Sequence, residues 1–289
     1  MAGSASIQDI KRRVRSVTSI EHITNAMKLV SAAKLRRAKD TFENTREYFF
    51  YVTETIADIF NNTADIPSKY LRGSREIKTT CYIIVTSNRG LAGSFNSNII
   101  KMAEQEMKAD PEKPYIVAVG SKGRDYFRRR DYAIPSEYLL PPENISFVET
   151  HNISKPIIDL YNEGTIDEVV LIYTSFISSL EQRPKMVTLL PFDIERDPDI
   201  MPFEKPVEYD PSPADVFNYL VPKYVEIMIY GAIVESATCE HAARRMAMEN
   251  ATDNAQSMIT DLNLTFNRAR QAAITREITE IVSGADALE

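Results

Sequence analysis

Residues 220–262 of the chain read LVPKYVEIMIYGAIVESATCEHAARRMAMENATDNAQSMITDL. A strict seven-residue step runs through this stretch and beyond it, and it passes through Leu220, Ile227, Val234, His241, Met248, Ala255, Leu262, Ala269 and Arg276. A heptad kept over so many turns is typical of a coiled-coil helix. Small or polar residues near this seam would let a partner backbone come close: Ala237, Thr238, Ala251, Thr252, Ala272 and Ala273.

The length of this predicted helix requires a partner along it. A helix from about Pro222 to Ser283 would be roughly 90 Å long at 1.5 Å per residue. A compact globule of 289 residues has a radius of gyration of only about 19 Å. The helix must therefore project, and we expect the N-terminal segment to pack against it in the antiparallel direction.

The N-terminal segment has the matching pattern. Apolar residues recur there at steps of three and four, as in one face of an amphipathic helix: Ile7, Ile10, Val14, Val17, Ile20, Ile23, Met27 and Val30. All 15 prolines lie between Pro67 and Pro222, and proline disrupts a helix interior at a cost of about 3 kcal/mol. Two long helices around a globular insert are therefore predicted.

The insert alternates between predicted strands and helices. Strands are expected at 79–86, 114–120 and 168–176, and helices at 96–108, 121–130 and 153–164. This alternation indicates a mainly parallel sheet with right-handed crossovers, and residues 185–192 are expected to add an antiparallel edge strand. The predicted fold class is α/β, with a Rossmann-like domain at 76–211 between coiled-coil helices at 1–75 and 212–289.

Composition excludes several functional classes. The net charge of −7 argues against nucleic acid as the main partner, and no apolar run approaches the length needed to span a bilayer. The N-terminus lacks the apolar core of a secretory signal. Cys81 and Cys239 are too few for a disulfide scaffold or a four-thiolate metal site. A reducing, cytosolic setting fits best.

One turn raises the question of a phosphate site. Residues 86–96, TSNRGLAGSFN, follow a predicted strand and precede a predicted helix. Gly90 and Gly93 do not form a GxGxxG pattern, and no phosphate-reaching lysine follows as in a P-loop. A structural corner is the preferred interpretation, with a protein contact or a phosphate site as alternatives. The short turn of residues 120–123 is an equally weak indication of a phosphate site.

No catalytic or metal motif stands out elsewhere. The three histidines, His22, His151 and His241, are far apart in sequence, and none belongs to an HExxH motif. The segment 11–39 carries nine basic residues against Glu21 alone. We interpret these basic residues as contacts to acidic surfaces of protein partners, while a solvated face, a lipid surface or nucleic acid are alternatives.

Four blocks of sequence carry a family resemblance. They are 10–38 (IKRRVRSV, HITNAM and AAKLRRA), 87–93 (SNRGLAG), 240–255 (EHAARRMAM and ATDNA) and 267–285 (NRARQAAITREITEIVSGA). Together they resemble the gamma subunit of F-type ATP synthase, and the last block is the most specific. The match covers both ends and the middle of the chain.

The resemblance implies a rotor shaft with no active site of its own. In this family the terminal helices enter a barrel of three alpha and three beta subunits, and the globular domain lies near the epsilon subunit and the membrane c ring. The shaft couples ion flow through that ring to ATP synthesis or hydrolysis. ATP, ADP and Mg²⁺ bind to alpha and beta, so no cofactor is expected on this chain, and its expected location is peripheral, on the cytoplasmic side of a bacterial cell membrane.

The resemblance also implies roles for individual residues. Those expected to contact beta subunits are Arg268, Arg270, Gln271 and Thr275 near the upper shaft, with Arg89 and Gly90 in the glycine turn. The expected bearing tip comprises Ile278, Ile281, Val282 and Leu288, and the side that faces the c ring comprises Arg36, Arg37 and Tyr209.

The sequence differs from the usual family pattern at two positions of the glycine turn. Asn88 and Ala92 stand where the family usually has aspartate and often has cysteine, so polar contacts of the turn can differ. No cysteine lies between Cys81 and Cys239, so the redox control of chloroplast members is not expected.

The alternative functions are a nucleotide-binding Rossmann enzyme with coiled-coil oligomerisation arms, and a basic scaffold on a membrane surface.

Overall fold

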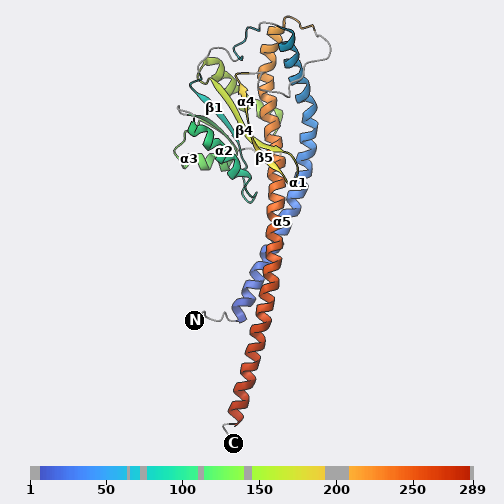
Figure 1. Ribbon diagram of the computed structural model, residues 1–289, viewed down its shortest axis with the longest axis vertical. Coiled ribbons are helices and arrows are strands. Elements are labelled where there is room, and N and C mark those ends of the chain that lie inside the picture. Colours follow the sequence, from blue (N-terminus) through green and yellow to red (C-terminus); the bar gives the residue numbers. More distant parts are fainter. Residues whose placement is uncertain are drawn as a thin grey trace. The chain divides into compact units, whose positions relative to one another are not determined.

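The computed structural model describes residues 7–63, 66–71, 77–109, 114–139, 145–192 and 208–286. They form two compact units: one contains the residues up to Val30 and from Arg245 onward, and the other comprises Ser31–Arg244. Two helices, α1 (Ile7–Asn62) and α5 (Pro213–Asp286), contribute to both units (Figure 1). The domain boundaries expected after residues 75 and 211 stay a prediction.

The larger unit is built on a five-stranded sheet with the order β3-β2-β1-β4-β5. Its strands are β1 (Thr80–Val85), β2 (Tyr115–Val119), β3 (Ser136–Tyr138), β4 (Glu168–Phe176) and β5 (Gln182–Leu190). β1 pairs in parallel with both β2 and β4, and β3 continues the parallel set beside β2. β5 is antiparallel to β4 at one edge. The mostly parallel sheet and the antiparallel edge strand are thus confirmed.

Helices cover both faces of this sheet (Figure 1). Alternate residues of β1 point to opposite faces, as the pleat requires. Tyr82 and Ile84 join the core under α2 (Phe95–Ala109) and α3 (Ser121–Arg128). Cys81, Ile83 and Val85 join the core formed with α4 (Phe147–Glu163) and with the parts of α1 and α5 in this unit. Because β1 is buried on both faces, it is a continuous apolar run.

Two local features differ from the sequence-based expectation. α4 begins at Phe147 rather than near residue 153, because Ser146 and Glu149 form a capping box at its start. The helix ends at Gly164, whose φ of 76° suits glycine. β3 was not predicted, since its three residues carry no apolar pattern.

Within the larger unit, α1 and α5 pack side by side in opposite directions. The rings of Phe49 and Tyr224 lie 6.4 Å apart, centroid to centroid. Nearer the end of α1, the Tyr209 hydroxyl donates a hydrogen bond to Oδ2 of the fully buried Asp58 at 2.6 Å. Both the burial and this hydrogen bond raise the pKa of Tyr209. The expected antiparallel pairing is confirmed in this unit.

In the smaller unit the seam between the helices is partly polar. Thr252 Oγ1 donates to Thr24 Oγ1 at 2.8 Å, and both residues are buried. Ile10 is buried, whereas Ile20, Ile23 and Val30 are about half exposed, at 49%, 57% and 56%. The predicted apolar stripe of α1 is therefore only partly confirmed, because Val14, Val17 and Met27 are half-buried while Ile20, Ile23 and Val30 are exposed.

The heptad of α5 agrees with the structure over most of its length. Ile227, Val234 and His241 are buried in the larger unit, and Met248 and Ala255 in the smaller one. Leu220, Leu262 and Ala269 are half-buried, and Arg276 is exposed. No helix within the described ranges is both long enough and apolar enough to cross a membrane.

Candidate functional site

The turn after β1 is held by a dense set of hydrogen bonds. The Ser87 amide donates to Asn96 Oδ1 at 2.9 Å, and the Ser87 hydroxyl donates to the Arg89 carbonyl at 2.6 Å. Asn88 Oδ1 accepts from the Ser121 amide at 2.9 Å, and its side-chain nitrogen donates to the Leu139 carbonyl at 3.0 Å. The turn is thus fixed to the starts of α2 and α3 rather than left as a free loop.

One glycine at this corner is required for steric reasons. Gly120 ends β2 with a φ of 96°, and a Cβ there would lie 2.1 Å from the Thr86 carbonyl oxygen. That contact is impossible, so β1 and β2 approach each other only because position 120 has no side chain. Gly90 is different: a Cβ there would meet only Cε of Lys122, at 3.9 Å.

Arg244 of α5 binds the backbone of the turn after β1. Its Nε and Nη2 donate to the Gly90 carbonyl at 3.3 and 3.2 Å, and Nη2 also reaches the Arg89 carbonyl at 3.4 Å. Nη2 further donates to Glu240 Oε1 at 2.6 Å. Arg244 and Glu240 are 8% and 6% exposed. The predicted positions 89 and 90 are therefore joined to α5 by a buried, charge-assisted contact.

An apolar contact lies beside this ion pair. Ala92 and Phe95 form a small buried cluster with Cys239 of α5. Burial and, less strongly, the nearby Glu235 carboxylate raise the pKa of the Cys239 thiol. A thiol held protonated in this way is a packing group rather than a nucleophile.

Sequence reasoning missed Arg244 as a site residue. It lies 154 positions from Gly90, so only the fold brings the two together. The one available signal was the spacing of Glu240 and Arg244, which lets an ion pair form along one face of a helix.

The four residues expected to grip beta subunits all lie on α5 and are exposed: Arg268, Arg270, Gln271 and Thr275. At 3.6 residues per turn, roughly 100° each, Arg268, Gln271 and Thr275 share one face of the helix. Arg270 faces away from them. The helix thus brings three of the four predicted contacts together.

The expected tip follows directly on that face. Ile278 and Val282 continue the stripe of Gln271 and Thr275, and they are 57% and 53% exposed. Ile281, 66% exposed, lies nearer the face of Arg270. Leu288 lies outside the described residues. Every described side chain from 270 to 283 is exposed, so this helical segment has no packing partner within the described chain.

The residues expected on the c-ring side are separated by the structure. Arg36 and Arg37 are exposed on α1. Tyr209 is bound to Asp58, which lies roughly 30 Å further along α1 at 1.5 Å per residue. These three residues do not form one site.

Within the described ranges, no group of three or more histidine, cysteine, aspartate or glutamate residues could hold a metal ion. The central sheet, the paired helices and the docked turn are the main features of the described chain.

Comparison with known proteins agrees with this architecture. The chain matches the protein family described as ATP synthase over residues 6–288. It is 47% identical to the ATP synthase gamma chain of Alkaliphilus metalliredigens, with 98% of this chain and 99% of the relative covered. It is 40% identical to the sodium-ion-specific ATP synthase gamma chain of Acetobacterium woodii, with 98% and 99% covered.

Two solved structures share the fold. A chain of the Euglena gracilis mitochondrial ATP synthase matches with a TM-score of 0.67 at 18% identity, covering 99% of this chain and 95% of that one. A chain of the Tetrahymena thermophila mitochondrial ATP synthase, solved as central stalk and c ring, matches with a TM-score of 0.60 at 24% identity, covering 79% and 99%. The chain therefore belongs to the family of ATP synthase gamma chains, which are subunits of the ATP synthase complex.

Proposed function

We propose that this chain is the rotating central shaft of an F-type ATP synthase. It couples ion flow through a membrane c ring to ATP synthesis or hydrolysis on three alpha and three beta subunits. The chain itself is not catalytic, and ATP, ADP and Mg²⁺ act on the alpha and beta subunits. An epsilon subunit binds beside it, and the complex lies at the cytoplasmic side of the cell membrane.

One observation carries this proposal: α5 continues as a helix over residues 270–283 with every side chain exposed. Ile274, Ile278, Ile281 and Val282 are between 48% and 66% exposed. An isolated helix gains little stability without a packed apolar face. The segment therefore needs a partner, and a sleeve of alpha and beta subunits would provide an apolar one.

The shaft must also act differently on each beta subunit. Moving one catalytic site from 1:99 to 99:1 in favour of one nucleotide state needs about 5.5 kcal/mol of differential contact. A hydrogen bond to a charged group contributes roughly 1.5–3 kcal/mol, so several must act together. Arg268, Gln271 and Thr275 on one face of α5 suit this role, and the docked turn at Arg89 and Gly90 supplies a second contact.

Reconstitution with alpha and beta subunits tests the proposal. We expect one copy of the chain per complex to be required for sustained ATP hydrolysis. The double variant Gln271→Ala with Thr275→Ala should lower turnover about tenfold, because it removes two polar contacts worth about 0.5–1.5 kcal/mol each. Folding of the chain should be unaffected, since both side chains are exposed.

A matched control exists on the same helix. Gln256 and Thr260 have the same residue types, spacing and exposure, and their replacement by alanine should leave turnover unchanged. A chain that stays apart from alpha and beta would contradict the shaft assignment. Unchanged turnover in the Gln271 and Thr275 variant, in synthesis and in hydrolysis, would contradict the site assignment alone.

A further inference from the structure

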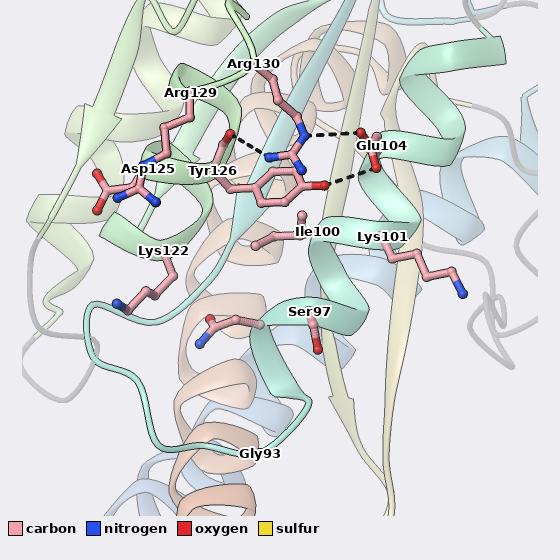
Figure 2. A pocket seen from close by; sticks show the side chains of 11 residues that line it. Gly93, Ser97, Ile100, Lys101, Glu104, Lys122, Asp125, Tyr126, Arg129 and Arg130 are labelled. Carbon is pink, nitrogen blue, oxygen red and sulfur yellow. Dashed lines mark hydrogen bonds and ion pairs between the residues drawn. The ribbon is translucent and has the colours of Figure 1, made fainter.

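A pocket of about 520 Å³ opens between α2 and α3 in the larger unit (Figure 2). It begins beside Gly93 and Lys122, which follow β1 and β2. Open α/β sheets bind ligands at this carboxyl edge of their parallel strands. The volume lies within the range of small-molecule sites.

The charges that line the pocket do not balance. The two carboxylates are already paired: Asp125 lies 2.7 Å from Arg124 Nη2, and Glu104 lies 3.4 Å from Lys108 Nζ and 3.7 Å from Arg130 Nε. The remaining lining cations are Lys101, Lys122 and Arg129, and within the described ranges none of these three is found in an ion pair. A local excess of positive charge on a chain with net charge −7 points to an anionic ligand.

One wall of the pocket is rigid. The Arg130 guanidinium lies over the Tyr126 ring, 3.6 Å from its centroid. The Tyr126 hydroxyl donates to Glu104 Oε2 at 3.2 Å, and this bond links α3 to α2 across the pocket (Figure 2). Lys122 and Arg129 extend from the α3 side of the pocket, whereas the Lys101 side chain extends from α2 away from them (Figure 2). Lys122 and Arg129 therefore lie beside a preorganised wall.

Backbone amides of α3 take no part in this recognition. The Ser121, Lys122 and Gly123 amides donate to Asn88 Oδ1, the Ser87 carbonyl and Thr86 Oγ1 at 2.9, 3.1 and 2.9 Å. The start of α3 thus resembles a nucleotide-binding turn in topology, but its donors are already used. Recognition must come from side chains, and lysine and arginine side chains are well suited to phosphoryl oxygens.

We propose that this pocket binds a small free anion with at least two phosphoryl groups, held by Lys122 and Arg129. This site would be an exception to the expectation that the chain binds no small ligand. The inference does not depend on the proposed shaft function, because it concerns residues distant in sequence from the α5 contacts.

Titration of the full chain with inorganic pyrophosphate at low ionic strength tests the site. The double variant Lys122→Gln with Arg129→Gln should weaken binding about tenfold or more, because two charge-assisted contacts are lost. The matched control is Lys155→Gln with Lys185→Gln, two exposed lysines of α4 and β5, and it should bind as the parent does. Pyrophosphate should also protect Lys122, but not Lys155, from acetylation read by mass spectrometry.

The remaining arms separate the possible sources of the phosphoryl group. ADP should bind at least as tightly as pyrophosphate, and vesicles of phosphatidylglycerol in phosphatidylcholine should not bind through this pocket. Binding to vesicles without binding to pyrophosphate or ADP would overturn the proposal in favour of a membrane surface. The absence of pyrophosphate binding would also overturn the proposal. An equal loss of binding in the control variant would overturn it too, because it would show unspecific electrostatic attraction.

Discussion

At the residue scale, Arg244 joins the glycine turn to α5 through one buried guanidinium group. Arg244→Met would remove the donor to the Arg89 and Gly90 carbonyls and the cation 2.6 Å from Glu240. Breaking a buried ion pair costs about 3–5 kcal/mol. We expect the free energy of unfolding, measured in urea, to fall by about 3 kcal/mol.

The neighbouring arginine provides the control for this variant. Arg245 pairs with Glu249 at 3.8 Å, and its side chain is 30% exposed. Arg245→Met should cost clearly less than Arg244→Met, because the pair of Arg245 with Glu249 is partly exposed and its charges are partly screened by solvent. Adding Glu240→Gln to Arg244→Met should recover part of the loss, because no charged carboxylate is then buried without Arg244. Equal costs for Arg244 and Arg245 would contradict this account.

Substitution of the two glycines of the corner should change stability to very different extents. Gly120→Ala places a Cβ against the Thr86 carbonyl at a positive φ, so we expect a loss of at least about 3 kcal/mol in the free energy of unfolding. Gly90→Ala meets only the end of the Lys122 side chain and should change stability by less than about 1 kcal/mol. Urea unfolding of both variants checks this, and a mild effect of Gly120→Ala would show that the corner can rearrange.

At the element scale, the two ends of α5 should differ in stability. Its first part packs in the core with Phe217, Val221 and Val225, whereas residues 270–283 are exposed on every side. Amide hydrogens of 270–283 should therefore exchange rapidly in the isolated chain, and those near 217–240 slowly. On assembly with alpha and beta subunits, we expect 270–283 to become protected. Slow exchange there in the isolated chain would remove the argument for a partner.

The elements that the sequence predicted well are those with strong local patterns. The heptad through Ile227 and Met248 and the apolar run of β1 are buried as expected. β3 was missed because three residues carry no period. Part of the α1 stripe was misjudged because Ile20 and Ile23 are apolar but exposed, and sequence alone cannot separate a surface for another subunit from a core.

The candidate site was harder to predict, since its contacts join distant segments. Arg89 and Gly90 were expected to contact beta subunits. Their hydrogen-bond partner Arg244 could not be predicted, because only the fold brings α5 close to the turn. The pocket cations Lys101, Lys122 and Arg129 come from two different helices and the residue after α3, so no local spacing indicated them. The roles expected for individual side chains on α5 stay predictions.

At the scale of the whole molecule, the ionisable groups of the larger unit predict a loss of stability in alkali. Burial raises the pKa of Cys81, Cys239 and Tyr173 in the folded state. The unfolded chain ionises first, so stability is present below the ordinary pKa of each group, about 9 for cysteine and about 10 for tyrosine. Above that pH each group lowers the stability by about 1.4 kcal/mol per pH unit. Urea titrations from pH 7 to 10.5 test this. Cys239→Ala should make the free energy of unfolding fall less steeply with pH. Equal stability of the parent chain at pH 7 and pH 10.5 would contradict the prediction.

The contact between Arg244 and the turn has a mechanical consequence. Leu91 projects from the turn with 62% of its surface exposed, while the carbonyls before it are bound to Arg244 and Ala92 after it packs against Cys239. A lateral force applied at Leu91 therefore acts on a backbone that is fixed on both sides. It is transmitted to α5 through Arg244 and the Ala92–Cys239 contact, and to the starts of α2 and α3 through Ser87 and Asn88. The turn should therefore move with these helices as one stiff body.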